Sequence, residues 1–132
     1  MELSSAVRAF LSEARFGSAA TVARDGSPQQ TAMWYELQGD EIMMNTKVGR
    51  AKERNLKRDP RCSLCVVEGY RYVSVRGRAT LDYDPATAQA DIAHLAVRYQ
   101  GEERARRAIE NFRREQRVTI RFRIEHVASS GL

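Results

Sequence analysis

Residues 71–82 alternate between apolar and other side chains, and this pattern limits the chain to folds that contain a half-buried β-strand. The apolar face of the expected strand carries Val73, Val75, Ala79 and Leu81. The opposite face carries Tyr72, Ser74, Arg76 and Arg78. A strand with one apolar and one polar face is typical of an antiparallel sheet that covers a core on one side.

Turn dipeptides indicate several further strands around this one. Asp25-Gly26 and Glu68-Gly69 each predict a hairpin between two strand-like segments. Another turn and strand follow in "LQGDEIMMNT". The chain closes with "RVTIRFRIEHV", whose alternating apolar residues are Val118, Ile120, Phe122 and Ile124. Because most of these strands are joined by hairpins, we expect about six of them in a mostly antiparallel sheet.

Four helices are expected between the strands. The first covers residues 4–14, and the second stops at Asp59-Pro60 because the residue before proline avoids helical angles. The third begins at Pro85 behind the cap Asp84, and Gly101 separates it from the fourth. We therefore predict one mainly β domain over residues 1–132, a barrel-like six-stranded antiparallel sheet with short helices on its rim.

The charge and hydropathy of the chain limit the classes of ligand and partner that we expect. Lys and Arg outnumber Asp and Glu by 22 to 17, which gives a net charge of +5 and a modest preference for anionic ligands. No apolar run approaches the roughly 18 residues of a membrane span, and no signal peptide is visible. Basic residues interleaved with aromatics are absent, so nucleic acid is not an expected partner. A cytoplasmic protein is the expectation.

Catalytic motifs are missing, and the catalytic residues stay unknown at this point. There is no G-x-S-x-G motif and no carboxylate pair suited to acid–base work. Cys62 and Cys65 form a C-x-x-C, but on a strand they point to opposite faces, so we expect packed free thiols and no metal site. His94 is expected in solvent. His126 falls in the inward register of the last strand and is expected to be partly buried.

The segment "NTKVGRAKERNLKRDP" gives the strongest functional signal. Helix geometry places Lys52 and Asn55 on the side that should meet the sheet, among Val48, Ala51 and Leu56. A buried lysine is costly unless it meets an anion. Thr46, Gly49 and Arg50 stand at the start of this helix, where free N–H groups favour phosphate. The features fit either a phosphate site or an ordinary amphipathic helix.

The pattern T-x-x-x-R-A-K-x-R-N-L-K-R-D-P-R-C-S-L from Thr46 onward, with "DGSPQQTAMWYE" before it and "GYRYVSVRGRATL" after it, resembles the flavin and deazaflavin oxidoreductase superfamily. The resemblance covers about residues 10–127. It implies a pyridoxamine 5'-phosphate oxidase-like split β-barrel, and within it the branch that uses the deazaflavin coenzyme F420. It also implies a homodimer with two cofactors in clefts between protomers.

The resemblance assigns roles to particular residues. Thr46, Arg50 and Lys52 match the positions that hold the cofactor phosphate. Gln30, Thr31 and Met33 match the strand along the tricyclic ring, and Tyr70 matches an aromatic residue offered by the other protomer. Asn45 and Asn55 complete the expected cofactor-binding set. Because a regular helix would put Arg50 opposite Lys52, both reach one phosphate only if Arg50 lies in the non-helical entry turn.

Coenzyme F420 is the expected cofactor, with FMN as the alternative. Pyridoxamine-phosphate oxidases end in an R-L-x-P motif, whereas this chain ends in "RIEHVASSGL". The oligoglutamate tail of F420 would favour a basic groove, which Lys47, Arg54, Lys57 and Arg58 could line. The implied reaction is hydride transfer from reduced F420 to a small unsaturated organic substrate. Alternatives are a flavin or haem-like carrier or sensor without turnover, with His126 as axial ligand, and a dimer with an empty cleft.

Overall fold

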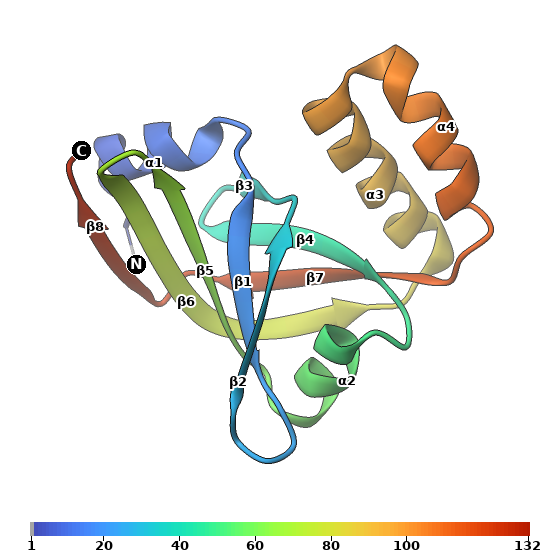
Figure 1. The fold of residues 1–132 in the computed structure, drawn as a ribbon, viewed down its shortest axis with the longest axis horizontal. Coiled ribbons are helices and arrows are strands. Elements are labelled where there is room, and N and C mark those ends of the chain that lie inside the picture. Colours follow the sequence, from blue (N-terminus) through green and yellow to red (C-terminus); the bar gives the residue numbers. More distant parts are fainter. Residues whose placement is uncertain (1) are drawn as a thin grey trace.

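A computed structural model describes residues 2–132 as eight strands and four helices (Figure 1). The strands are β1 (Gly17–Val22), β2 (Pro28–Met33), β3 (Glu36–Gln38), β4 (Glu41–Lys47), β5 (Arg61–Glu68), β6 (Arg71–Asp82), β7 (Arg117–Arg123) and β8 (His126–Ser130). The helices are α1 (Ser5–Ser12), α2 (Ala51–Arg58), α3 (Pro85–Gln100) and α4 (Glu102–Phe112).

The strands form one curled antiparallel sheet in the order β2-β1-β5-β6-β7-β4-β3, and β8 pairs with β6. The mainly β, split-barrel class expected from the sequence is therefore confirmed. The expected six strands are corrected to eight for two reasons. Trp34 and Tyr35 interrupt the strand after the first hairpin and make β3 a separate element, and the last strand breaks at Ile124 and Glu125.

Local signals placed most element ends correctly. The hairpins turn at Gly26 and Gly69, both of which have positive φ angles that suit glycine. Helix α2 ends at Arg58, with Asp59 as its extended C-cap before Pro60. The side chain of Asp84 caps α3 by accepting a hydrogen bond from the Thr87 N–H at 3.0 Å.

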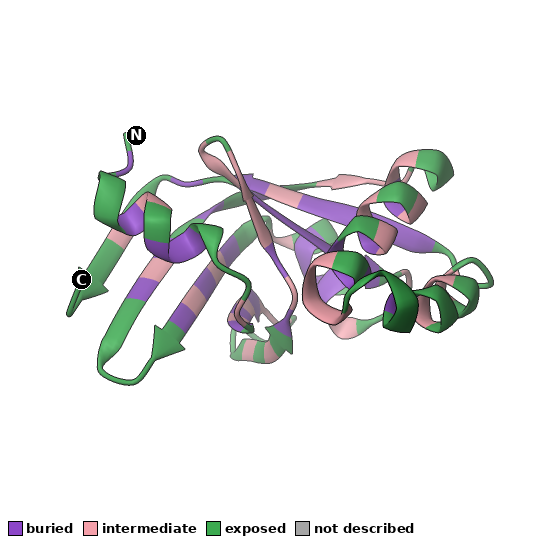
Figure 2. Cartoon of the chain, turned by 90° about the horizontal axis from the view of Figure 1, so that it is seen from above, coloured by how far each residue is buried: buried purple, intermediate pink, exposed green. Residues whose placement is uncertain are grey.

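The core lies inside the curl of the sheet, and helices α1 and α2 close its two ends. Phe10 and Leu11 from α1 and Leu56 from α2 join the same buried cluster as Tyr35 and Phe122. Helix α3 packs on the outer side of β4 and β7, where a second cluster forms. Buried residues, purple in Figure 2, concentrate in the strands, whereas α4 is largely exposed.

The outer face of β1, β5, β6 and β8 carries exposed polar side chains. His126 belongs to this face, because it pairs with Arg76 while Val127 points inward and packs against the core. The expectation that His126 is partly buried in the inward register is therefore wrong. The break at Glu125 shifts the alternation by one residue, and such a slip moves a side chain to the other face of the sheet.

The described residues 2–132 include no helix long and apolar enough to cross a membrane. They also include no group of three or more His, Cys, Asp or Glu side chains that could hold a metal ion. His94 is exposed, as expected, and its Nε2 lies 2.7 Å from a Glu36 carboxylate oxygen.

Cys62 and Cys65 differ in burial, and the reaction of their thiols with a thiol reagent can measure this difference. Cys62 is buried in the core, whereas Cys65 lies on the outer face and is half-buried. Burial raises the pKa of the Cys62 thiol to about 12, so its reactive thiolate is scarce. In a Cys65→Ser variant we expect Ellman's reagent to modify the remaining thiol only as fast as the protein unfolds. Rapid modification of the folded variant at pH about 8 would contradict the buried position; denatured protein is the control for full reactivity.

Candidate functional site

The side chain of Lys52 is the centre of the site. It projects from the first turn of α2 and is only 8% exposed. No carboxylate of residues 2–132 lies within 4.0 Å of its amine. Burial first, and then the positive charges of Arg50 and Arg117, lower the pKa of Lys52. The Lys52 side chain is therefore largely buried, as the helix geometry predicted, and no carboxylate among the described residues pairs with its charge.

Arg50 lies just outside the regular part of α2. It is the N-cap of α2, with an extended backbone (φ −73°, ψ 161°), and helical geometry begins only at Ala51. The direction of its side chain therefore does not follow the helical spacing that would place it opposite Lys52. Gly49, with φ of 98°, makes the tight turn that precedes it. The sequence analysis required Arg50 to lie in the non-helical entry turn if Arg50 and Lys52 are to reach one phosphate. The structure places Arg50 in that turn.

Glu53 holds this turn in place, and the sequence analysis missed it. Its carboxylate is 2% exposed and accepts hydrogen bonds from the Gly49 N–H at 2.9 Å and from the Tyr83 hydroxyl at 2.6 Å. Although burial raises the pKa of Glu53, the bonds from Tyr83 and Gly49 lower it overall. Lys57 lies 3.4 Å from the same carboxylate and balances its charge. A glutamate at the third helical position commonly reaches back to a backbone N–H at the start of its helix, and this local signal could have revealed the role.

Arg117 is a second residue that sequence reasoning missed. It opens β7, opposite Lys47 of β4, and is 8% exposed. Its Nε donates to the Asn45 side-chain oxygen at 3.0 Å and its Nη1 to Glu115 at 2.8 Å. Burial lowers the pKa of Arg117, and Glu115 opposes that effect. No local signal identifies this arginine, because it reaches Arg50 and Lys52 only through the pairing of β4 with β7.

The two expected asparagines have partners inside the chain. Asn45 holds Arg117 and donates to the Ala88 carbonyl at 2.9 Å, which ties β4 to α3. Asn55 donates to the Thr21 hydroxyl at 3.1 Å, which ties α2 to β1. Thr46 is buried on the alternate side of β4 from Asn45. Of the two polar residues expected on the sheet side of α2, only Lys52 is left for a ligand.

The three expected residues of β2 do not share one face. Gln30 lies on the outer face and donates to the Ser18 hydroxyl at 2.9 Å, whereas Thr31 pairs with the buried Ala19 and points to the core side. The Thr31 hydroxyl is buried and has no hydrogen-bond partner within residues 2–132. Met33 is buried at the end of the strand. A buried hydroxyl without a partner is costly, so this group lowers the stability of the free protein.

Tyr70 lies apart from the other candidates within one chain. It is 100% exposed, in the turn between β5 and β6, at the end of this hairpin opposite to α2 (Figure 1). Its ring is therefore accessible to a ligand or to another chain.

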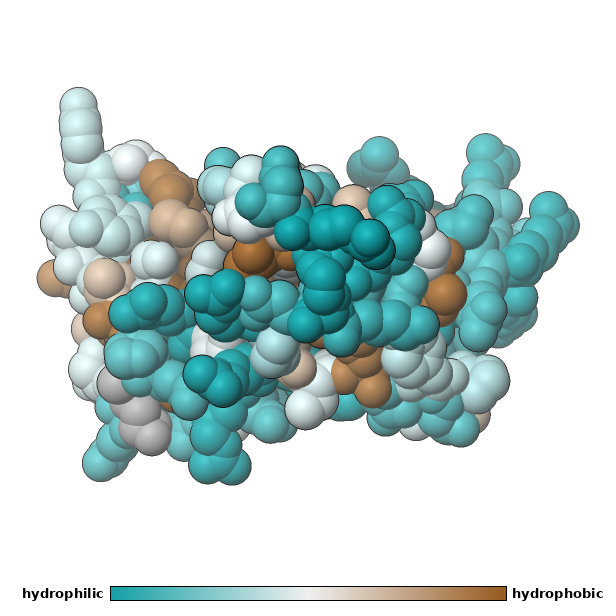
Figure 3. All heavy atoms as spheres, turned by 90° about the horizontal axis from the view of Figure 1, so that it is seen from below, coloured by the Kyte–Doolittle hydropathy of each residue, from teal (hydrophilic) through white to brown (hydrophobic). Residues whose placement is uncertain are grey.

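A basic cavity of about 430 Å³ lies between α2 and the turn of the first hairpin. It is lined by Arg24, Arg54, Asn55, Lys57 and Arg58. Figure 3 shows hydrophilic side chains gathered over this end of the molecule. The cavity contains three of the four cations expected to form a groove. Lys47 is not among them, because it lies 3.8 Å from Glu115, and Arg24 takes its place.

Comparison with known proteins places this arrangement in a family. Residues 3–130 match the family profile of pyridoxamine 5'-phosphate oxidase. The chain belongs to this family. It is thus a member of the pyridoxamine 5'-phosphate oxidase-like flavin and deazaflavin oxidoreductase superfamily, whose fold binds flavin-type cofactors.

Solved structures agree with this assignment. The chain is 28% identical to an F420 reductase, with a TM-score of 0.75 over 92% of this chain and 94% of that one. It is 30% identical to a conserved hypothetical protein from Mycobacterium tuberculosis, with a TM-score of 0.80 over 98% of this chain and 85% of that one. A Listeria innocua protein provisionally assigned as a pyridoxamine 5'-phosphate oxidase shares the fold, at 18% identity and a TM-score of 0.73 over 98% of both chains.

Proposed function

We propose that this protein is an oxidoreductase that binds the deazaflavin coenzyme F420 and passes a hydride from its reduced form to a small unsaturated organic molecule. The observation that carries the proposal is the largely buried Lys52 side chain, which lies near Arg50 and Arg117 and has no carboxylate partner among residues 2–132. A phosphate group would neutralise these cations and accept hydrogen bonds from the free N–H groups at the start of α2. Thr46, near the end of β4, is proposed to add a hydroxyl donor.

The isoalloxazine-like ring of the cofactor fits along β2. This strand pairs only with β1, so the N–H and C=O groups of its other edge are available to the polar side of the ring. The unpartnered Thr31 hydroxyl lies in the same strand. Trp34, which stacks on Tyr99 with ring centroids 5.4 Å apart, follows directly and would report on binding. In a homodimer, which the family commonly forms, the exposed Tyr70 of the partner would complete the cleft.

The basic cavity favours F420 over FMN. Both cofactors carry a ring and a phosphate, but only F420 has an oligoglutamate tail. Arg24, Arg54, Lys57 and Arg58 surround a cavity with no acidic lining residue among those described, so a flexible polyanion gains electrostatic energy there. FMN has no tail that could interact with these charges. It remains the second candidate because its phosphate could bind to Lys52 and Arg50.

The protein's part in the reaction is to bind and orient. When bound, the reduced deazaflavin supplies the hydride to an electron-poor alkene, imine or enone. Lys52 and Arg50 fix the phosphate end, and the β2 backbone orients the ring. N–H groups of β2 would stabilise negative charge that develops on the pyrimidine side of the ring. The proposed site contains no paired acid and base, so protonation of the product is assigned to solvent.

The direct test is a titration of the purified protein with oxidised F420 and with FMN, followed by Trp34 fluorescence. We expect micromolar affinity for F420 and weaker binding of FMN. Oxidation of reduced F420 in the presence of a panel of enones then tests turnover. Failure to bind either cofactor would overturn the proposal, and binding of both without turnover would reduce it to a carrier.

The Lys57→Ala variant separates the tail from the phosphate. Lys57 is exposed and lines the basic cavity, while Lys52 on the same helix faces inward. We expect Lys57→Ala to weaken F420 by about two- to fivefold, as for one exposed ion pair, and to leave FMN unchanged. The loss should shrink as salt is added. Equal losses for the two cofactors would contradict the placement of the tail.

Thr31→Val tests the unpartnered hydroxyl. Valine has nearly the same shape and removes a buried polar group without a partner, so the free protein should be as stable as the wild type or more stable, by up to about 1 kcal/mol. Cofactor affinity should fall by about two- to tenfold, the value of one hydrogen bond. Urea denaturation and the fluorescence titration measure the two effects. A destabilised free protein would show that the hydroxyl has a structural partner.

A further inference from the structure

The turn that precedes α2 is held by side chains as well as by backbone hydrogen bonds. The N–H groups of Val48 and Arg50 donate to backbone carbonyls, at 2.8 and 3.3 Å. The Gly49 N–H instead donates to the Glu53 carboxylate at 2.9 Å, and the Gly49 carbonyl accepts a hydrogen bond from the exposed Arg54 side chain. Glu53 is thus the buried side chain that closes this turn.

Glu53 is in turn anchored to a distant part of the chain. Its second carboxylate oxygen accepts a hydrogen bond from the Tyr83 hydroxyl at 2.6 Å. Tyr83 lies between the end of β6 and Asp84, the N-cap of α3, and α2 packs beside β6 (Figure 1). Lys57 balances the charge of the carboxylate, but its side chain is 60% exposed, so this ion pair adds little to the anchoring. Glu53 and Tyr83 therefore tie the turn to the junction of β6 and α3.

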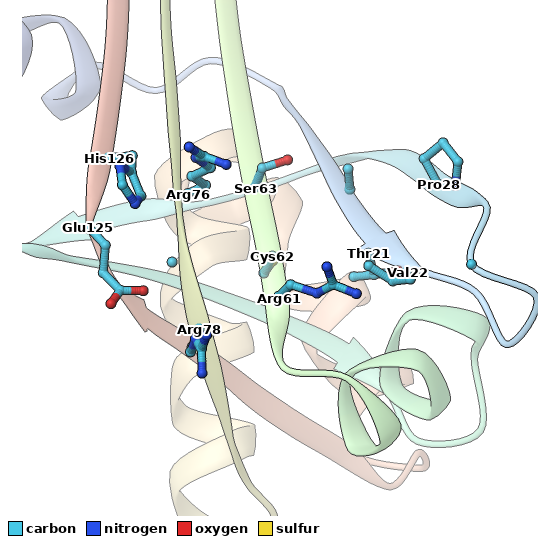
Figure 4. A pocket seen from close by; sticks show the side chains of 13 residues that line it. Thr21, Val22, Pro28, Arg61, Cys62, Ser63, Arg76, Arg78, Glu125 and His126 are labelled. Carbon is cyan, nitrogen blue, oxygen red and sulfur yellow. The ribbon is translucent and has the colours of Figure 1, made fainter.

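The contact between Glu53 and Tyr83 is complete within one chain. The Glu53 side chain is 2% exposed. Neither residue lines the cavity on the outer face of the sheet, which Figure 4 shows from close by. The contact therefore does not depend on whether another molecule covers that face.

The position of the Glu53 carboxylate leaves the start of α2 open to an anion. A carboxylate near a helix start competes with a bound phosphate for the same N–H groups. Glu53 takes the Gly49 N–H, which lies outside the helix. The N–H groups of Ala51 and Lys52 have no acceptor within residues 2–132. They remain available to a phosphate beside the Arg50 and Lys52 side chains.

We propose that Glu53 is a positioning residue for the cofactor: it holds Gly49 and Arg50 in the non-helical turn, so that Arg50 and Lys52 are arranged for one phosphate before the cofactor binds. Tyr83 fixes the Glu53 carboxylate in this place. The inference rests on the proposed function, since the phosphate is that of the cofactor. Such preorganisation raises affinity because the turn loses little freedom on binding. Glu53 acts through Arg50 and does not itself contact the phosphate.

The first measurement needs no cofactor. Hydrogen exchange at the Gly49 amide is followed by NMR in the ¹⁵N-labelled wild type, in Glu53→Ala and in Glu53→Gln. Glu53→Ala removes the acceptor of this N–H, so the exchange rate should rise about tenfold or more. Glutamine keeps the shape and one acceptor oxygen, so Glu53→Gln should stay within about threefold of the wild type. An unchanged rate in Glu53→Ala would overturn the proposal.

The second measurement is the affinity for oxidised F420, followed by Trp34 fluorescence. We expect Glu53→Ala to lower it about tenfold, Tyr83→Phe about two- to fivefold, and Glu53→Gln less than about threefold. Asp84→Ala is the matched control, because it removes the cap of α3 next to Tyr83 and costs stability without touching α2. It should change the affinity less than about twofold. Circular dichroism and the melting temperature confirm that each variant is folded.

A double-mutant cycle with Arg50 separates a positioning role from a merely structural one. If Glu53 arranges Arg50 for the phosphate, Arg50→Ala has less to remove once Glu53 is replaced. We expect the loss of F420 affinity on Arg50→Ala to be at least about threefold smaller in the Glu53→Ala background than in the wild type. Equal losses in the two backgrounds would show that Glu53 only stabilises the fold, and would overturn the proposal.

The failure of this proposal and the failure of the proposed function give different results. If the wild type binds neither F420 nor FMN, the proposed function fails and the positioning role fails with it. If the wild type binds F420 and Glu53→Ala binds it equally well, only the positioning role fails. Should Glu53→Ala not fold, Tyr83→Phe decides: wild-type Gly49 exchange together with wild-type affinity in that variant overturns the positioning role.

Discussion

Replacing Lys52 by methionine is expected to remove cofactor binding and, at the same time, to leave the free protein as stable as the wild type or more stable. The Lys52 side chain is largely buried near Arg50 and Arg117, and no carboxylate of residues 2–132 lies within 4.0 Å of its amine. Its charge therefore opposes folding until a phosphate binds. Loss of a charge-assisted contact to a buried phosphate costs about 2–3 kcal/mol, which is a thirty- to hundredfold loss of affinity.

The pH dependence of stability follows from the same lysine. Because burial and the two arginines lower the pKa of Lys52 in the folded protein, the unfolded chain binds more protons between that lowered pKa and the ordinary value of about 10.4. The free energy of unfolding contributed by this group therefore rises with pH in that window. The stability advantage of Lys52→Met over the wild type should shrink as the pH is raised through it.

Urea denaturation at several pH values and the fluorescence titration measure the two halves of this prediction. Arg106→Met is the control, since it removes one positive charge from an exposed side chain of α4. It should leave FMN affinity unchanged. If Lys52→Met destabilises the free protein by more than about 1 kcal/mol, or retains wild-type affinity, Lys52 is a structural residue and the proposed phosphate site fails.

Gly77→Ala is expected to destabilise the protein by about 3 kcal/mol or more, with no direct effect on the cofactor site. A Cβ atom at this position would lie 2.1 Å from the backbone oxygen of Arg123 and 3.1 Å from the Phe122 ring. The backbone oxygen cannot rotate away as a side chain can. It belongs to the segment by which the chain passes from β7 to β8, so relieving the clash would disturb the pairing of both strands with β6.

Two glycine variants serve as graded controls for Gly77→Ala. At Gly17 the atom within 2.4 Å of an added Cβ is the end of the Leu64 side chain, which can move, so the cost should be smaller. At Gly26 nothing lies within 4 Å, but φ is +88°, so Gly26→Ala should cost about 1–2 kcal/mol from backbone strain alone. Urea denaturation measures the free energy of unfolding of all three alanine variants. A Gly77→Ala protein as stable as Gly26→Ala would show that β7 and β8 can separate without loss.

Structural features that depend on residues close together in the chain were predicted well. The glycine turns at Gly26 and Gly69, the stop of α2 before Pro60 and the cap at Asp84 all depend on the angles and hydrogen bonds of a few neighbouring residues. The alternation in β6 correctly assigned its inner and outer faces. The inward position of Lys52 followed from helical spacing alone.

Except for Glu53, whose contact with Gly49 is local, the errors and omissions involve contacts between distant segments. His126 was assigned to the wrong face because the break at Glu125 depends on how β8 pairs with β6. Arg117 was missed because Asn45 and Lys47, its neighbours across the sheet, are some 70 residues away in the sequence. The free hydroxyl of Thr31 was not foreseeable, since it depends on which side chains fill the core beside it.

The sequence by itself determined the class of the fold, the positions of the turns and the presence of one inward-facing amine, because short-range backbone preferences and side-chain periodicity depend only on neighbouring residues. The tertiary structure decided which charges meet. It brings Arg50, Lys52 and Arg117 to one place. Strand register sets this grouping, and register is fixed by the packing of the whole core, which no short stretch of sequence encodes.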